Sequence, residues 1–300
     1  MTSGADAQIR TYYGRPVVKE PEWTWEVPWY LFFGGLAGTS SLLAAVARAR
    51  GNVALARAAR LVAGAGAAVS PPLLIADLGR PSRFLNMLRV FKPSSAMSVG
   101  SWILAAYSPV AMGAAAAEVT GWVPRLQLLA DATGAVLGPA MTGYTAVLVA
   151  DTSIPVWHEA RNQLPLVFAS SGAASAGAAA LLLTPAPQAG PARRLAIGGA
   201  VAELAAEAGM QRRLGEIGEV YSNDAAGALS KAAKVCNAAG ALLIAIGGPR
   251  RALLTRTGAL ALLAGGVLQR WAVYKAGFQS ARDPRSVGEP QRRRLEERSG

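Results

Sequence analysis

Long apolar segments, repeated along the chain, constrain its fold more than any other feature. We count eight segments of about 18–25 residues, each long enough for a helix to cross roughly 30 Å of hydrocarbon. The chain is 52% hydrophobic and 16% charged, against about 25% charged residues in soluble domains. The sequence therefore predicts an all-α, polytopic membrane protein with eight transmembrane helices. The segments lie at residues 28–47, 56–76, 96–117, 126–149, 164–183, 193–210, 230–248 and 252–276.

Polar residues at both ends of the chain lie outside this membrane domain. We expect a polar N-terminal segment at 1–27, an eight-helix membrane domain at 28–278 and a charged tail at 279–300. The first segment has no short apolar core followed by a small-residue cleavage site, so we expect no cleaved signal peptide. The tail contains many charged residues, which predicts a solvated segment near anionic lipid.

The formal charge of +12 is carried by loops and tails beside the predicted spans. We therefore expect the basic residues to contact membrane lipid, and we expect no nucleic-acid partner. With eight spans both termini lie on one face, which carries 20 of the 30 Lys and Arg residues against 10 on the other. Because positively charged loops remain in the cytoplasm, this distribution predicts cytoplasmic termini.

Cysteine and histidine counts limit the redox groups that this chain can hold. Cys236 is the single cysteine, whereas an iron–sulfur cluster usually needs about four thiolates. His158 is the single histidine, and membrane cytochromes b commonly hold each haem between two histidines. The sequence thus predicts no haem, no Fe–S cluster and no metal site in this chain, so any metal centre belongs to a partner.

Three stretches carry a resemblance to a known family. They are "TYYGRPVVKEPEWTWEVPWYLFFGGLAG" at 11–38, "DLGRPSRFLNMLRVFKPSSAMSVGSW" at 77–102 and "GYTAVLVADTSIPVWHEARNQLP" at 143–165. Together they resemble the NrfD/PsrC family, the membrane subunits of polysulfide reductase and related molybdenum oxidoreductases. The resemblance covers most of the first five predicted spans, whereas the part after about residue 190 matches only in hydropathy and length.

This resemblance implies a fold, a function and partners. It implies two four-helix bundles, no haem, and a site for menaquinone or another quinone near the membrane surface. It also implies a four-cluster iron–sulfur protein and a molybdopterin catalytic subunit as partners. The chain would then be the membrane anchor that passes electrons between the partner's clusters and the quinone pool of a respiratory chain, in the plasma membrane of a prokaryote. It would not be a complete enzyme alone.

The resemblance also implies residues that hold the quinone. By motif position, the polar residue at the start of the first span is Tyr30, and the tyrosine near the end of the fourth span is Tyr144. Some family members have histidine at the first position, and a phenol is a poorer proton donor than an imidazolium. We therefore expect Glu26, one turn earlier, to supply the acidic group. The alternative for Tyr30 is an interfacial aromatic belt with the neighbouring tryptophans.

The stretch "ADLGRP" is typical of a helix end, since Gly79 suits a left-handed cap and Pro81 would stop the helix. Its span ends on the face where Tyr30 begins the first span. We therefore expect Asp77 and Arg80 to pair beside the quinone. The alternative is a helix cap with basic residues that anchor the loop at the membrane surface.

Two further candidates lie on the same face. Ser95 can cap the third span together with Ser98, or it can orient a quinone oxygen. His158 can relay protons to the quinone, or it can stabilise the interface with a partner beside Glu159.

Glu203 and Glu207 lie one turn apart inside the sixth predicted span. Carboxylates within a membrane are candidates for function, so a proton path is one hypothesis and pairing with Arg212 or Arg213 is another. Eight spans with buried carboxylates also suit a proton-coupled secondary transporter, which is the alternative to the electron-transfer function.

Overall fold

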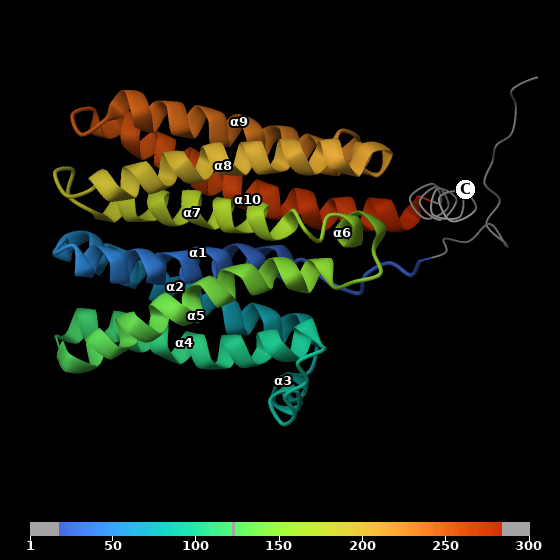
Figure 1. The fold of residues 1–300 in the computed structure, drawn as a ribbon, viewed down its shortest axis with the longest axis horizontal. Helices are drawn as coiled ribbons and strands as arrows, with labels where there is room; N and C mark the ends of the chain where they lie inside the picture. The colour runs from blue at the N-terminus through green and yellow to red at the C-terminus, as the bar shows by residue number, and fades with distance from the viewer. Residues whose placement is uncertain (1–17, 122–123, 284–300) are drawn as a thin grey trace, which may run out of the picture.

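The computed structural model describes residues 18–121 and 124–283, and its regular elements in these ranges are all helices (Figure 1). Residues 1–17 of the predicted N-terminal segment and 284–300 of the predicted tail lie outside the described residues. The helices are α1 (Glu26–Ala49), α2 (Val53–Asp77), α3 (Pro81–Met87), α4 (Ala96–Thr120), α5 (Pro124–Ala150), α6 (Pro155–Glu159), α7 (Leu164–Leu183), α8 (Gly190–Leu214), the 3-10 helix η1 (Gly215–Tyr221), α9 (Asp224–Gly247) and α10 (Ala252–Arg282).

Seven of these helices are long and apolar enough to cross a membrane, namely α1, α2, α4, α5, α7, α9 and α10. The prediction of an all-α polytopic membrane protein is confirmed, and the chain is an integral membrane protein. Of the eight predicted spans, seven meet the criteria of length and apolarity, and α8 does not. Helix α8 has 25 residues but carries six charged side chains, which lower its hydropathy.

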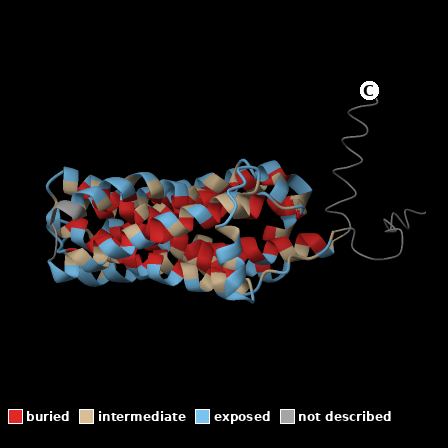
Figure 2. Cartoon of the chain, turned by 90° about the horizontal axis from the view of Figure 1, so that it is seen from below, coloured by how far each residue is buried: buried red, intermediate tan, exposed pale blue. Residues whose placement is uncertain are grey.

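The long helices lie along a common direction (Figure 1), and their mutual contacts divide the eight of them into two groups of four. In the first group α1 packs against α2 and α5, and α4 completes the group by packing on the same two helices. In the second group α7 packs against α8, and α9 packs against α10. Helix α1 also contacts α7 and α10, so it joins the two groups. Buried residues line the space between the helices and exposed residues cover the outside (Figure 2).

Small residues allow α1 and α5 to approach backbone to backbone. A Cβ added at Gly38 would lie 2.3 Å from the carbonyl oxygen of Gly138. A Cβ added at Gly138 would likewise lie 2.3 Å from the carbonyl oxygen of Gly38. A Cβ at Gly34 would lie 2.8 Å from the Cε of Met141. These distances are shorter than any van der Waals contact, so glycine at these positions is what lets the two helix backbones approach this closely.

Helix α8 packs against α7 just as closely. A Cβ at Gly177 would lie 2.4 Å from the backbone nitrogen of Ala196, and one at Gly199 would lie 2.3 Å from the nitrogen of Ala174. Helix α8 is therefore part of the second group despite its charges, rather than a helix on its surface.

The two ends of the helix bundle differ. One end, called here the α6 end, is where α1, α4, α7 and α9 begin, and it carries α3, α6 and η1 (Figure 1). The other, called the turn end, carries the turns 50–52, 184–189 and 248–251. The three short helices were not predicted from the sequence. Gly79 has the expected positive φ of 70°, but Pro81 begins α3 instead of only ending α2, because proline suits the first position of a helix.

Candidate functional site

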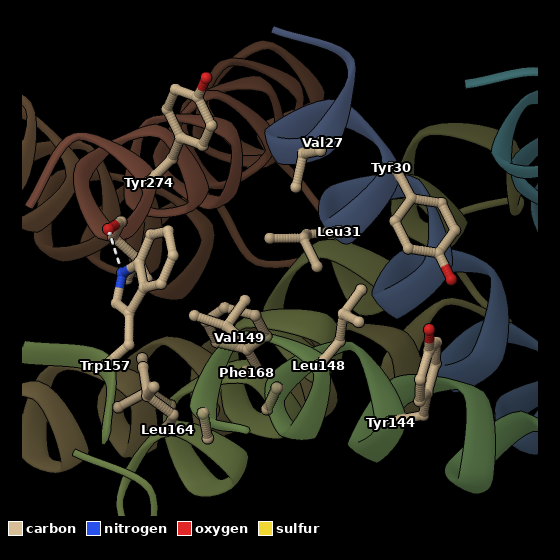
Figure 3. Packing of buried hydrophobic residues seen from close by; sticks show 14 of the residues in the cluster. Val27, Tyr30, Leu31, Tyr144, Leu148, Val149, Trp157, Leu164, Phe168 and Tyr274 are labelled. Atoms are coloured by element: carbon tan, nitrogen blue, oxygen red, sulfur yellow. Dashed lines mark hydrogen bonds between the residues drawn. The ribbon is translucent and has the colours of Figure 1, made fainter. Parts of the chain in front are cut away.

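Two tyrosines face each other inside the bundle near the α6 end. Tyr30 on α1 is 1% exposed and Tyr144 on α5 is 5% exposed. Figure 3 shows their hydroxyl groups pointing toward one another. Apart from each other, the two hydroxyls have no hydrogen-bond partner among the residues that the structure describes. Because a buried polar group without a partner costs about 1–3 kcal/mol, this pair is suited to a ligand or water that would satisfy it.

Apolar side chains and a glycine fix the position of the pair. Leu31 and Leu148 belong to the same buried cluster and lie beside the tyrosines in Figure 3. The ring of Tyr144 lies directly on Gly100 of α4, where an added Cβ would be 1.5 Å from Cζ. The absence of a side chain at Gly100 therefore makes the space that the ring occupies.

Two acidic residues from different helices meet above the start of α1. Asp77, at the end of α2, accepts hydrogen bonds from the backbone nitrogen and the Oγ1 of Thr24, each at 2.9 Å. The same Oγ1 also contacts the carboxylate of Glu26. A hydroxyl has one hydrogen, so it can donate to only one of the two carboxylates at a time. Glu26 lies four residues before Tyr30, and these two residues therefore share a face of α1.

Asp77 does not pair with Arg80, although the sequence suggested that pair. Arg80 is exposed and precedes the first residue of α3, whereas Asp77 is held by Thr24. The partner of Asp77 thus comes from a distant segment of the chain and not from its own loop.

Ser95 and His158 each have local partners at the α6 end. Ser95 is the N-cap of α4, where its Oγ accepts from the backbone nitrogen of Ser98 at 3.4 Å. The structure thus supports the capping role for Ser95. His158 is exposed on α6, and its carbonyl accepts a hydrogen bond from Arg161.

The described part of the N-terminal segment crosses the α6 end and joins α2 to α10. Trp23 stacks on Trp157 of α6 with ring centroids 5.2 Å apart, and its carbonyl accepts a 2.7 Å hydrogen bond from Tyr274. Glu20 pairs with Arg282 at 2.8 Å. The hydrogen bond from Arg282 lowers the pKa of Glu20 below its ordinary value of 4.5. Because the partners are more than 100 residues apart in most of these contacts, no local pattern in the sequence indicates them.

A buried network of charges at the turn end was missed by the sequence analysis. Arg60 of α2 donates to both carboxylate oxygens of Asp131 on α5, at 2.8 and 2.6 Å, and to Glu118 of α4 at 2.6 Å. Arg60 and Asp131 are each 5% exposed. Arg48 of α1 lies 3.4 Å from Asp131. The sequence could have indicated this network, because Arg60, Glu118 and Asp131 lie near the ends of three predicted spans that reach the same face of the membrane. The network ties together all four helices of the first group.

A second buried polar cluster lies within the other group of helices. Glu203 and Glu207 of α8 are 0% and 4% exposed, and Asn237 of α9 and Arg270 of α10 are each 1% exposed. The positive charge of Arg270 acts on both carboxylates, while its guanidinium lies 3.8 Å from the ring centre of Phe168. Within the described ranges, the carboxylate of Glu203 forms no hydrogen bond of ordinary geometry, although Ser171 and Asn237 lie close enough to interact with it. The carboxylates therefore face the interior, and the cation beside them is on another helix.

The exposed Arg212 and Arg213 are not the partners of these carboxylates, although the sequence allowed that pairing. Among the described residues, no three His, Cys, Asp or Glu side chains gather where they could hold a metal ion.

A model of a known protein family matches a large part of the chain. The family model described as "Polysulphide reductase, NrfD" matches residues 18–196. The matched region is more than half of the chain and includes both tyrosines, both acidic residues above α1, all four helices of the first group and α7, and it ends in the first turns of α8. No curated protein matches the chain.

Proposed function

Since the chain belongs to the polysulphide reductase NrfD family, we propose that it is the haem-free membrane anchor of an iron–sulfur and molybdopterin oxidoreductase. In this role it binds menaquinone or another quinone. It passes electrons between the Fe–S clusters of a partner and the quinone pool of the plasma membrane of a prokaryote. The observation that carries the proposal is the pair of buried hydroxyls of Tyr30 and Tyr144, which face each other near one end of the membrane helices and have no other partner among the described residues.

The tyrosine pair fits a quinone because a quinone carbonyl accepts the hydrogen bonds that the two hydroxyls leave unused. Tyr30 and Tyr144 donate to the carbonyl, and the surrounding leucines exclude water from the ring. A bound quinone supplies two-electron chemistry that is coupled to the uptake or release of two protons.

Glu26 and Asp77 are the proposed proton-handling groups. Thr24 links their carboxylates through a single hydroxyl hydrogen, so a proton added to either carboxylate completes the hydrogen bonding of both. Glu26 is only partly buried and Tyr30 follows it by one turn, which gives a short route between solvent and the tyrosine pair. His158 is exposed at the same end, where it would exchange protons with solvent.

The α6 end is the proposed docking face for the four-cluster iron–sulfur protein. The tyrosine pair and the two carboxylates lie near this end, and electron transfer needs a short distance between the partner's cluster and the quinone. Arg80 and Ser95, on either side of α3, would contribute to this face: Arg80 through its exposed charge and Ser95 by fixing the start of α4.

We further propose that α8 is the eighth membrane span. It runs from the turn end to the α6 end beside α7, and its two glutamates are buried inside the bundle. Charges that face the interior do not meet lipid, so low mean hydropathy does not prevent α8 from spanning. Eight spans place both termini on one side, and the distribution of basic residues favours the cytoplasm.

Purification of the tagged chain from its native membrane tests this function. We expect an iron–sulfur subunit, a molybdenum-containing subunit and extractable quinone in the same assembly. A Tyr144→Phe variant should assemble equally well but reduce quinone more slowly, because it lacks one donor. An assembly without iron–sulfur protein and without quinone would contradict the proposal. Uptake of a solute by the chain alone in vesicles would favour the proton-coupled transporter instead.

A further inference from the structure

A cavity of about 140 Å³ opens at the turn end of the second helix group. It lies between the turn that joins α7 to α8 and the turn that joins α9 to α10. Thr184, Arg193, Thr255 and Arg256 are the polar residues that line it, and the remaining lining residues are apolar or glycine. The cavity is far larger than the roughly 10–15 Å³ that one water molecule requires. It can therefore hold a chemical group larger than water.

Two donors at this cavity have no partner among the residues that the structure describes. The Oγ1 of Thr184 and the Nε of Arg193 are buried and form no hydrogen bond. Thr184 as a residue is only 7% exposed. Buried donors without an acceptor are unfavourable, so their presence beside an open cavity indicates an acceptor that binds there.

The charge around the cavity has one sign. The segments 184–194 and 248–256 contain five arginines and no acidic residue. None of these arginines forms an ion pair within the part of the chain that the structure describes. An anion in the cavity would therefore meet Arg193 and Arg256, which line it, while the other three arginines on the adjoining segments add only longer-range attraction. The five are Arg193, Arg194, Arg250, Arg251 and Arg256.

Two helices also begin at this cavity. Helix α8 begins at Gly190 and α10 begins at Ala252, and neither start has a side-chain cap. The free backbone N–H groups and the helix dipole give each start a partial positive charge. Both effects add to the attraction that the arginine side chains exert on an anion.

From this cavity, its unpartnered donors and its arginines, we propose that the turn end of the second group binds a phosphate group through Arg193, Thr184 and Arg256. The turn end is where the helices leave the membrane, so an anionic phospholipid headgroup and free inorganic phosphate can both reach the site. Basic pockets between membrane helices bind lipid headgroups by this chemistry. The proposal does not depend on the quinone function.

Binding to the purified assembly tests the site. The assembly is placed in nanodiscs of pure phosphatidylcholine or with added phosphatidylglycerol, and separately titrated with inorganic phosphate. Retained lipid is measured by mass spectrometry and phosphate binding by the shift in melting temperature. We expect Arg193→Gln to weaken binding about tenfold, as loss of one charge-assisted hydrogen bond predicts. Arg194→Gln is the matched control, because Arg194 is adjacent and exposed but does not line the cavity.

Each outcome decides the proposal. If the Arg193 variant retains less phosphatidylglycerol but binds inorganic phosphate as before, the site takes a lipid headgroup. If the variant binds less inorganic phosphate, the site takes free phosphate. Equal loss in the Arg194 variant means diffuse attraction and overturns the proposal, as does the absence of binding in every arm. If Arg193→Gln does not accumulate, Arg256→Gln provides the same comparison, and Arg193→Lys should retain most of the binding because it keeps the charge.

Discussion

Substitution of Gly100 by alanine should move the ring of Tyr144 while the fold stays largely stable. The new Cβ would lie 1.5 Å from Cζ of Tyr144, and carbon atoms in contact are about 3.5 Å apart or more. The ring must therefore move by roughly 2 Å. Overpacking of this kind costs about 1–3 kcal/mol of folding free energy, which an assembled membrane bundle can tolerate.

The effect on quinone turnover should be much larger than the effect on stability. Displacement of a positioning group by about 1 Å can lower a rate about 100-fold, so we expect Gly100→Ala to lose at least about 100-fold in quinone reduction. The assay is reduction of a water-soluble menaquinone analogue by the purified complex. The partner's activity with an artificial acceptor serves as the reference, and it should not change.

Two variants control for general damage. Gly113→Ala lies on the same helix, where an added Cβ meets no atom within 4 Å, and it should leave turnover unchanged. The double variant Gly100→Ala/Tyr144→Leu removes the ring atoms that clash, so it should recover stability but not turnover. If Gly100→Ala alone keeps full turnover, the tyrosine ring does not need its observed position and the reasoning is wrong.

Two more predictions concern charged contacts. Arg60→Ala removes both short hydrogen bonds to the buried Asp131 and leaves it only the 3.4 Å contact with Arg48, so it should cost about 3–5 kcal/mol in detergent unfolding experiments. Arg57→Ala removes an exposed 3.8 Å pair and should cost less than about 1 kcal/mol, so equal losses would contradict the buried-network account. The pKa of Glu20 is lowered by Arg282, so the stabilising contribution of this pair is fully present above pH 4.5 and is lost as pH falls through the lowered pKa. Hydrogen exchange of residues 18–25 should increase over this range, and Glu20→Gln should remove the part of the pH dependence that this pair causes.

The long helices could be predicted from the sequence because each needs only a sufficient length of apolar residues. Helix α8 was found by the same criterion although Glu203 and Glu207 interrupt it, since the residues around them are small and apolar. The short helices α3 and α6 could not be found, because five to seven residues carry no periodic signal.

Side-chain partners were harder to predict than helices. The sequence suggested Arg80 for Asp77 and Arg212 or Arg213 for the glutamates of α8, since these residues are neighbours along the chain. The structure gives Thr24 as the partner of Asp77, from a segment 53 residues away. Such contacts depend on how the helices assemble, which hydropathy does not determine. Tyr30 and Tyr144 could be named only through the family resemblance.

Photolabelling with a reactive quinone tests the central claim most directly. A quinone analogue with an azido group is bound to the purified assembly, cross-linked by light and mapped by mass spectrometry. The account predicts labels on α1 around Tyr30 and on α5 around Tyr144, and excess unlabelled quinone should suppress them. Saturable labelling of other helices, with none near the two tyrosines, would contradict it.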